Sequence, residues 1–312
     1  MGRTALFSRS QPGGVYTISD IEAHPGEIFF VDSGHAAASD AAGNGKNPDK
    51  PFATIDYAVG NCTANNGDVI YVMPGHTETL SDAGQLVFDV AGIKVIGLGH
   101  GESRPKIVHG TATDADVDIT GASTYLKNLV FCADFADVAV SIDLDATDCT
   151  FEDCEWRDNA SGENFVVYID ADDTANACDR LTVRRCTAFS PDTANDHFIA
   201  TAGDMDRLTV EDCWVSLGVA DGEAIIEAAT GKDFTNCLIL RNNFYRLNTA
   251  NVVAMESDTA ANSGIIAFNV VAHADTAAAT PFDVTGARLI ENYAIGVVDA
   301  SALLLPAVDD NA

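Results

Sequence analysis

The pattern of hydrophobic and polar positions predicts one helix near the N-terminus and short strands almost everywhere else. Residues 27–31, 69–73 and 93–96 are short apolar runs that indicate strands. Residues 52–62 predict an amphipathic helix instead, because apolar side chains recur there at helical spacing, at Phe52, Ile55, Val59 and Cys62. Beyond residue 80, short apolar runs alternate with Asp, Gly, Thr and Asn, a pattern that calls for a search for internal repeats.

One repeat runs through the second half of the chain: an apolar residue followed three positions later by Cys or Asn. The Cys or Asn positions are Cys132, Cys154, Cys186, Cys213, Asn243, Asn269 and Asn292. Unequal steps between them fit loops of variable length on a constant coil. A coil of this size buries its apolar face only by stacking on its neighbours. We therefore expect an all-β fold, a right-handed parallel β-helix in which these seven residues form one structural column at a coil corner, where Asn tolerates left-handed backbone.

Charged residues just before the column favour the same register. The residues two positions before Cys154, Cys186, Cys213 and Asn243 are Glu152, Arg184, Glu211 and Arg241. Stacked strands lie about 4.8 Å apart, so each arginine would lie between acids on the neighbouring coils. Asp153, Arg185 and Asp212 suggest a second alternation one residue further on. The sequence thus predicts a ladder of alternating charges beside the column.

These patterns divide the chain into four parts. Residues 1–26 form an N-terminal arm, which we interpret as an anchor, and residues 27–80 form a cap and first coil. Residues 81–300 form the coils of the β-helix. Residues 301–312 form a C-terminal cap or tail, with the apolar residues 303–305 covering the open end of the stack.

The stretch 47–79 (NPDKPFATIDYAVGNCTANNGDVIYVMPGHTET) resembles the N-terminal cap and first coil of pectin-lyase-like β-helix proteins. The matching positions are Pro51, Phe52, Thr54, Ile55, Gly67, Asp68, Ile70, Val72, Pro74 and Gly75, whereas His76 and Thr77 depart from that pattern. The opening EIFFVDSG (27–34) is similar to proteins common in tailed-phage genomes. The resemblance implies a fold that hosts lyases, hydrolases, adhesins and inert virion parts, so it leaves the function open.

Charge and cysteine content narrow the classes of partner. The chain has 47 acidic and 17 basic residues, a net charge of −30, which disfavours nucleic acid and anionic membranes. No run is long enough to span a membrane, and residues 1–12 lack the apolar stretch of a secretory signal. Eight cysteines form no CxxC pair, so we expect reduced, mostly buried thiols.

Three groups of aspartates are candidate metal ligands. They are Asp114, Asp116 and Asp118, then Asp143, Asp145 and Asp148, then Asp170, Asp172 and Asp173. Their carboxylates suit calcium, although solvated acidic loops are the favoured interpretation and no cofactor is required. The family resemblance implies that a pectate-lyase-type site would also need an Arg or Lys on the same strand face.

The candidate catalytic pair, if the chain is an enzyme, is Asp153 and Glu155 beside Trp156. Glycosidases use two carboxylates at a defined separation, but among 47 acids such pairs arise by chance. We therefore favour the interpretation in which Asp153 belongs to the charge ladder. The seven histidines follow no metal or catalytic motif.

The sequence favours a structural virion protein of a tailed phage: a non-catalytic capsid decoration, head spike or fibre component, assembled in the host cytoplasm. Its expected partners are other virion proteins, further copies in a homotrimer by likeness to phage β-helices, and a host surface glycan. One alternative is a tailspike-type polysaccharide lyase or hydrolase. Another is a carbohydrate-binding adhesin module, which a row of exposed aromatics would favour. The aromatics near the ladder are Trp156, Trp214, Phe244 and Tyr245.

Overall fold

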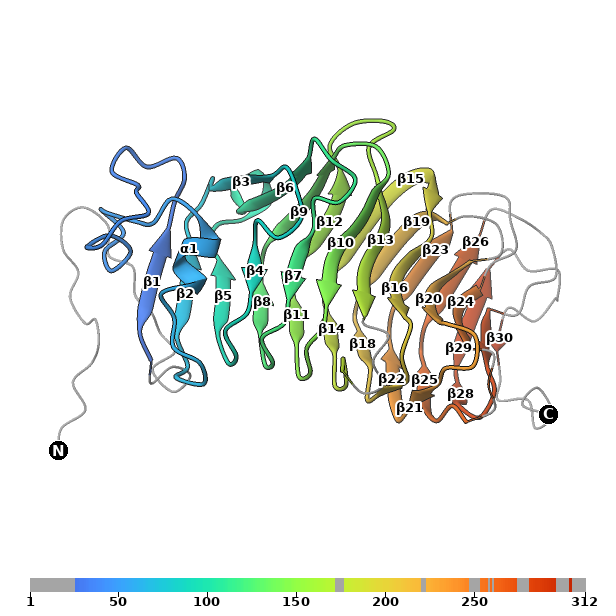
Figure 1. Ribbon diagram of the computed structural model, residues 1–312. Coiled ribbons are helices and arrows are strands. Elements are labelled where there is room, and N and C mark those ends of the chain that lie inside the picture. Colours follow the sequence, from blue (N-terminus) through green and yellow to red (C-terminus); the bar gives the residue numbers. More distant parts are fainter. Residues whose placement is uncertain are drawn as a thin grey trace.

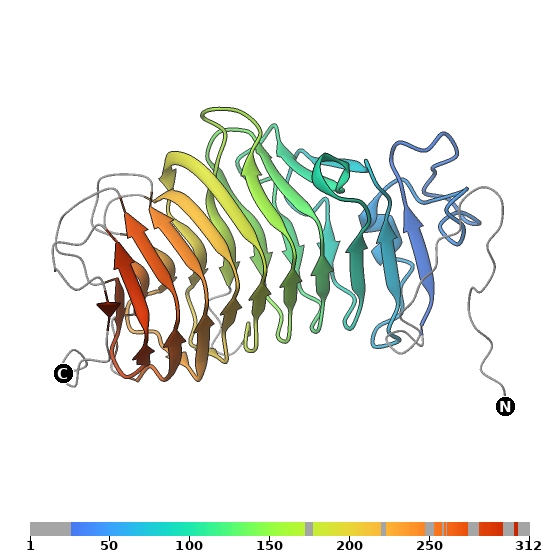
Figure 2. The same ribbon diagram turned by 180° about the vertical axis from the view of Figure 1, so that it is seen from behind.

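The chain winds as a right-handed parallel β-helix, as the repeat predicted. The computed structural model describes residues 26–171, 177–219, 223–246, 253–257, 259, 261–273, 281–295 and 303–304. Successive coils lie side by side along one axis, and three parallel sheets run the length of the rod (Figures 1 and 2).

Each sheet collects one strand from each successive coil. Sheet 1 has the order β1 (Ile28–Val31), β2 (Val69–Val72), β5 (Lys94–Gly97), β8 (Tyr125–Lys127), β11 (Thr150–Glu152), β14 (Thr182–Arg184), β18 (Thr209–Glu211), β22 (Cys237–Leu240), β25 (Gly264–Ala267) and β28 (Arg288–Ile290). Sheet 2 has the order β27 (Phe282–Val284), β24 (Val253–Ser257), β20 (Ala224–Ala228), β16 (His197–Thr201), β13 (Phe165–Ala171), β10 (Val138–Leu144), β7 (Val117–Ile119) and β4 (Val87–Phe88).

Sheet 3 completes the coils and follows sheet 1 closely along the chain. Its order is β3 (Thr77–Leu80), β6 (Lys106–Gly110), β9 (Val130–Asp134), β12 (Glu155–Asp158), β15 (Thr187–Asn195), β19 (Trp214–Val219), β23 (Asn243–Arg246), β26 (Val270–His273), β29 (Asn292–Ile295) and β30 (Leu303–Leu304). The strands β17 (Met205–Asp206) and β21 (Phe234–Thr235) form a separate pair, and η1 (Gly101–Ser103) is a single 3₁₀ turn.

The corner between sheets 1 and 3 carries a column of small buried residues. Its members are Leu129, Cys154, Cys186, Cys213, Asn242, Asn269 and Asn292, as the strand registers require. Five of these seven are residues that the repeat placed there. The asparagines are linked directly: Asn242 and Asn269 donate their side-chain amides to Asn269 Oδ1 (3.0 Å) and Asn292 Oδ1 (2.9 Å).

Two members of the predicted column were wrong. Cys132 lies in β9, opposite Val108 and Arg157, three residues beyond the corner. The corner residue of its coil is Leu129, because Leu126 is the core residue in register with Phe151. A pattern restricted to Cys and Asn misses a Leu in the same place.

Asn243 was also misplaced, by a single residue. It is the first residue of β23 and pairs with Trp214, whereas the preceding Asn242 occupies the column and accepts the Cys213 N–H at 2.9 Å. Two adjacent asparagines left the choice ambiguous in the sequence.

Two ionic columns flank this corner, and Arg241 is not in the one where the sequence placed it. Lys127, Glu152, Arg184 and Glu211 stand in register on sheet 1. Arg241 does not continue them, because Leu240 pairs with Glu211. Burial raises the pKa of Glu152, but hydrogen bonds from Lys127 (2.6 Å) and Arg184 outweigh it and hold that pKa at about 2.

Arg241 belongs to the second column, one residue further along each coil. This column contains Asn128, Asp153, Arg185, Asp212 and Arg241, and all five have positive φ between 51° and 57°. Arg185 Nε contacts Asp153 Oδ1 at 2.8 Å, and Arg241 Nε contacts Asp212 Oδ1 at 2.7 Å. Left-handed backbone disfavours side chains with a Cβ, so these ion pairs stabilise corners that glycine would otherwise favour.

The cap helix is shorter than its periodicity predicted. α1 spans Ile55–Val59, with Thr54 as N-cap and Gly60 as C-cap. Phe52 is extended instead, because its N–H donates to Phe30 O and its C=O accepts the Asp32 N–H. The apolar side chains at helical spacing thus fill the core from an extended segment, a helix and a turn.

The ends of the chain are described only in part. The predicted arm lies outside the described residues except for Gly26, and only Leu303 and Leu304 of the predicted C-terminal cap are described. β30 pairs antiparallel with β29 and so covers the edge strand of sheet 3. None of the helices in the described ranges is long and apolar enough to cross a membrane.

Aromatic and sulfur-bearing side chains fill the interior. Phe131 stacks on Trp156 at 5.1 Å between ring centroids, and Phe198 meets the same indole edge-on. All eight cysteines are free, and all except the half-buried Cys62 are buried. The interior is therefore a continuous apolar core, in which the thiols pack as small apolar groups.

Candidate functional site

Aspartates from three successive coils meet on the outer face of sheet 2. Asp143 in β10 is in register with Asp118 in β7 on one side and Asp170 in β13 on the other. The same position holds Ala200 in β16 and Glu227 in β20. Parallel stacking therefore places like charges on adjacent strands, the opposite of the alternation at the corner.

The electrostatics of this acidic column show mutual repulsion. Burial, together with Asp145, Asp118 and Asp170, raises the pKa of Asp143 to about 6. Burial and then Asp118 likewise raise the pKa of Asp116 to about 6. Carboxylate oxygens of Asp116, Asp118 and Asp143 lie within 4.8 Å of one another, which would suit a hard cation such as calcium.

The other candidate metal ligands are distributed differently. Asp114 is exposed and precedes β7 rather than sharing its face, and Asp148 is bound by Arg180 through Nε at 2.5 Å. Asp172 and Asp173 lie outside the described residues. The nine predicted ligands are therefore not three equal clusters, and the compact group draws on two of them.

A second group of metal-ligating side chains was not predicted. His197 in β16, Glu227 in β20 and Glu223, which directly precedes β20, offer ligand atoms within 4.8 Å of one another. His197 Nδ1 lies 2.8 Å from Ala224 O, and this nitrogen donates because a carbonyl oxygen can only accept. The other ring nitrogen, Nε2, lies 3.4 Å from Glu223 Oε2. The three residues come from adjacent coils, so no local sequence motif marks them.

The candidate catalytic pair is engaged in the ionic network. Asp153 contacts Arg185 (2.8 Å) and Lys127 (3.3 Å), and Glu155 contacts Arg104 (2.8 Å) and Arg157 (3.4 Å). Both carboxylates are therefore neutralised by basic side chains at the coil corner. Asp153 belongs to an ionic column, which is the interpretation that we favoured from the sequence.

A row of aromatic side chains lies on the outer face of sheet 3. Phe189 in β15 and Trp214 in β19 are 46% and 43% exposed, with parallel rings 6.4 Å apart. Tyr245 in β23 continues the row, 6.1 Å from Trp214. Of the aromatics noted in the sequence, Trp156 and Phe244 are buried instead. Such a platform suits the apolar faces of sugar rings.

Comparisons with known proteins give the fold. No family model matches the chain, and no curated protein matches it. Two solved structures are similar over 90% of it: a rhamnogalacturonan lyase (TM-score 0.50, 16% identity, 78% of that chain covered) and the pectate lyase Pel9A (TM-score 0.54, 13% identity, 79% covered). The chain shares the right-handed parallel β-helix fold with these two lyases. At such identities the likeness concerns the fold alone.

Among the described residues, the acidic column lacks the Arg or Lys that the sequence resemblance led us to expect on the same strand face. The described strands of sheet 2 carry neither Lys nor Arg. Arginines instead gather at the corners of sheet 1, where Arg180, Arg184, Arg185 and Arg241 pair with acids. The acidic column thus has clustered aspartates without a basic side chain on its own strands.

Sequence reasoning missed features that depend on the register of sheets 2 and 3. One signal was present: the short motifs VDI, IDL and IDA, around Asp118, Asp143 and Asp170, recur at similar spacing. Phe189 and Trp214 carried no such signal, because they differ in residue type and are offset by two residues in the register of sheet 3.

Proposed function

We propose that this chain is a structural, non-catalytic rod of a tailed-phage particle, such as a decoration, head spike or fibre component. The observation that carries the proposal is the double ionic column. Lys127, Arg184 and Arg185 pair with Glu152 and Asp153, and Arg241 pairs with Glu211 and Asp212 on later coils. Ion pairs between neighbouring coils resist bending and local opening of a rod. Such a chain would assemble with other virion proteins in the host cytoplasm, and a homotrimer is the expected state.

The thiols support assembly in a reducing compartment. Seven of the eight cysteines are buried, all eight are free, and burial raises the pKa of Cys149 to about 11. Proteins exposed to oxidising conditions usually pair their cysteines, and cytoplasmic proteins keep them reduced.

A second candidate function is glycan binding, favoured by the aromatic row. Phe189, Trp214 and Tyr245 lie on adjacent strands, and such a line of rings fits an extended saccharide chain better than a single compact ligand. Glycan binding is compatible with the structural role, since a surface rod would meet the host envelope first.

Purified particles test the structural role. Particles from lysates of the producing host would be washed, and their proteins quantified by mass spectrometry against the major capsid protein. We expect this chain in a fixed ratio to the capsid protein. Its absence from washed particles would overturn the proposal, as would release of reducing ends or unsaturated products when the pure protein is incubated with host polysaccharide.

A Trp214→Ala variant tests the glycan candidate. We expect it to lose retention on immobilised host polysaccharide, because it removes the central ring of the row. The matched control is Ile265→Ala, which also removes an exposed apolar side chain (39% exposed) but from sheet 1. Equal retention of both variants would eliminate this function.

A further inference from the structure

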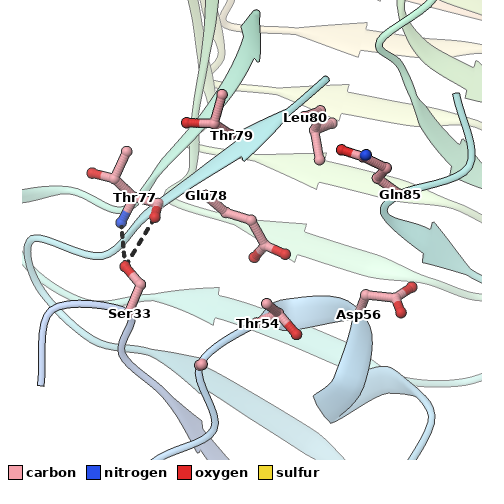
Figure 3. A pocket seen from close by; sticks show the side chains of 9 residues that line it. Ser33, Thr54, Asp56, Thr77, Glu78, Thr79, Leu80 and Gln85 are labelled. Carbon is pink, nitrogen blue, oxygen red and sulfur yellow. Dashed lines mark hydrogen bonds between the residues drawn. The ribbon is translucent and has the colours of Figure 1, made fainter. Parts of the chain in front are cut away.

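A cavity of about 550 Å³ lies between the cap and the first strand of sheet 3. It is bounded by the loop after β1, the start of α1, β3 and the turn before β4, as Figure 3 shows. Its lining includes Thr54, Asp56, Glu78 and Gln85. The ionic columns and the aromatic row lie on later coils, whereas the acidic column begins beside the cavity, where Asp118 is in register with Val87 of β4.

Glu78 is positioned at this cavity by a buried histidine. Its side chain is only 10% exposed, and its Oε2 accepts the Ile55 N–H at 2.9 Å and contacts His76 Nε2 at 3.2 Å. His76 is fully buried, and its Nδ1 accepts the Ser33 N–H at 2.9 Å, so the ring proton is on Nε2 and is donated to Glu78.

The second oxygen of Glu78 is left for a ligand. Oε1 forms no hydrogen bond with the described residues, and no Lys or Arg among them pairs with this carboxylate. Figure 3 shows the carboxylate directed into the cavity, with Thr54 and Asp56 opposite. The cavity is open to solvent, so water hydrates Oε1 in the free protein, and a ligand hydroxyl that donates to Oε1 would replace that water.

The remaining lining defines which ligand chemistry fits. Asp56 accepts the Val87 N–H at 3.2 Å, and its pKa is raised by burial and by neighbouring acids, Glu78 first among them. Two carboxylates and no basic side chain line the cavity, so it repels anionic ligands and favours ligands that carry hydrogen-bond donors. Ala53 and Leu80 add an apolar contact surface.

We propose that this cavity binds an uncharged sugar unit. Its volume lies in the range of small-molecule pockets, about 300–1,000 Å³, and far exceeds that of a bare cation. Sugar hydroxyls supply the donors that Glu78 and Asp56 lack, and a pyranose ring offers C–H groups to the apolar surface. The site goes beyond the structural role proposed above and does not depend on it. It also excludes uronates, because their carboxylate would lie beside two others.

Saturation-transfer difference NMR on the full chain tests this site. The probes are the methyl glycosides of glucose, galactose and mannose, with galacturonate and calcium chloride as competing chemistries. We expect saturation transfer to at least one neutral glycoside, none to galacturonate, and no displacement by calcium. Absence of transfer to every neutral glycoside, preference for galacturonate, or displacement by calcium would each overturn the proposal.

Two variants and one control locate the binding. Glu78→Gln keeps an oxygen for the Ile55 N–H but removes the charge, and we expect affinity to fall about tenfold, as for a lost charge-assisted hydrogen bond. Gln85→Trp fills the cavity from an exposed position in the turn before β4 and should abolish the signal. Asp49→Asn, an exposed acid of the cap outside the cavity lining, should leave it unchanged. Undiminished transfer in the Gln85→Trp variant would also overturn the proposal.

Discussion

Replacing Asn269 with alanine should destabilise the rod more than any exposed asparagine would. Asn269 is fully buried in the corner column and holds three coils together. Its Oδ1 accepts the Asn242 N–H (2.8 Å) and the Asn242 side-chain amide (3.0 Å). Its own amide donates to Ile239 O and to Asn292 Oδ1, both at 2.9 Å. The substitution removes all four hydrogen bonds.

The magnitude follows from these four bonds. A net contribution of about 1 kcal/mol each would give roughly 4 kcal/mol, and an unsatisfied buried donor costs about 1–3 kcal/mol. Relaxation around the smaller side chain offsets part of this loss, so we expect a decrease of roughly 3–5 kcal/mol in the free energy of unfolding. Asn61→Ala is the matched control, because exposed Asn61 donates a single hydrogen bond to Tyr57 O.

Urea unfolding followed by circular dichroism measures the overall change. Stacked coils can unfold separately, so hydrogen-exchange mass spectrometry should also be read on peptides covering β22 to β29. We expect faster exchange there than around α1. A decrease below about 1 kcal/mol, or an effect equal to that of the Asn61→Ala control, would refute the view that the amide ladder stabilises the stack.

Two further predictions concern the acidic column and the thiols. The pKa of Asp143 is raised from 3.8 to about 6, so the folded state binds the proton more tightly than the unfolded state. Stability should therefore fall as pH rises from 3.8 to about 6. Asp143→Asn should remove this part of the decline and raise the denaturation midpoint at neutral pH. If the variant and the wild type had the same pH profile, repulsion within the acidic column would be contradicted. Burial raises the pKa of Cys62 and Cys237 to about 12, so a thiol-reactive dye should label half-buried Cys62 first and slowly, and the buried thiols only on unfolding. Rapid labelling of several native thiols would contradict the packing.

The sequence predicted the parts of this fold that repeat in residue type. Identical residues such as Cys154, Cys186 and Cys213 reveal a column, and their neighbours reveal the charge alternation. Leu129 was missed because it fills the same place with a different residue type. The length of α1 was overestimated because helical periodicity cannot tell a helix from an extended residue such as Phe52 that buries its side chain in the same core.

The candidate sites were harder to predict than the fold, for a different physical reason. The cap cavity joins Ser33, Thr54 and Glu78, which belong to three separate segments and share no spacing. The acidic column needs the register of sheet 2, which varies with each intervening loop. A single sequence does not show which distant residues lie close together. The individual residues of the cap cavity and the acidic column could therefore be noted, but not their proximity in the fold.

The same register rule explains where the net charge of −30 resides. In a parallel stack each side chain faces its equivalents on the coils above and below, so a column either alternates in sign or accumulates like charges. This chain has few bases, and it places Lys127, Arg184, Arg185 and Arg241 at one corner, where they pair with acids of neighbouring coils. The described strands of sheet 2 then carry Asp and Glu but neither Lys nor Arg. Stiffness at the corner and repulsion on the face of sheet 2 are thus two results of one allocation of charge. Moving an arginine from the corner to sheet 2 would weaken the first in order to relieve the second.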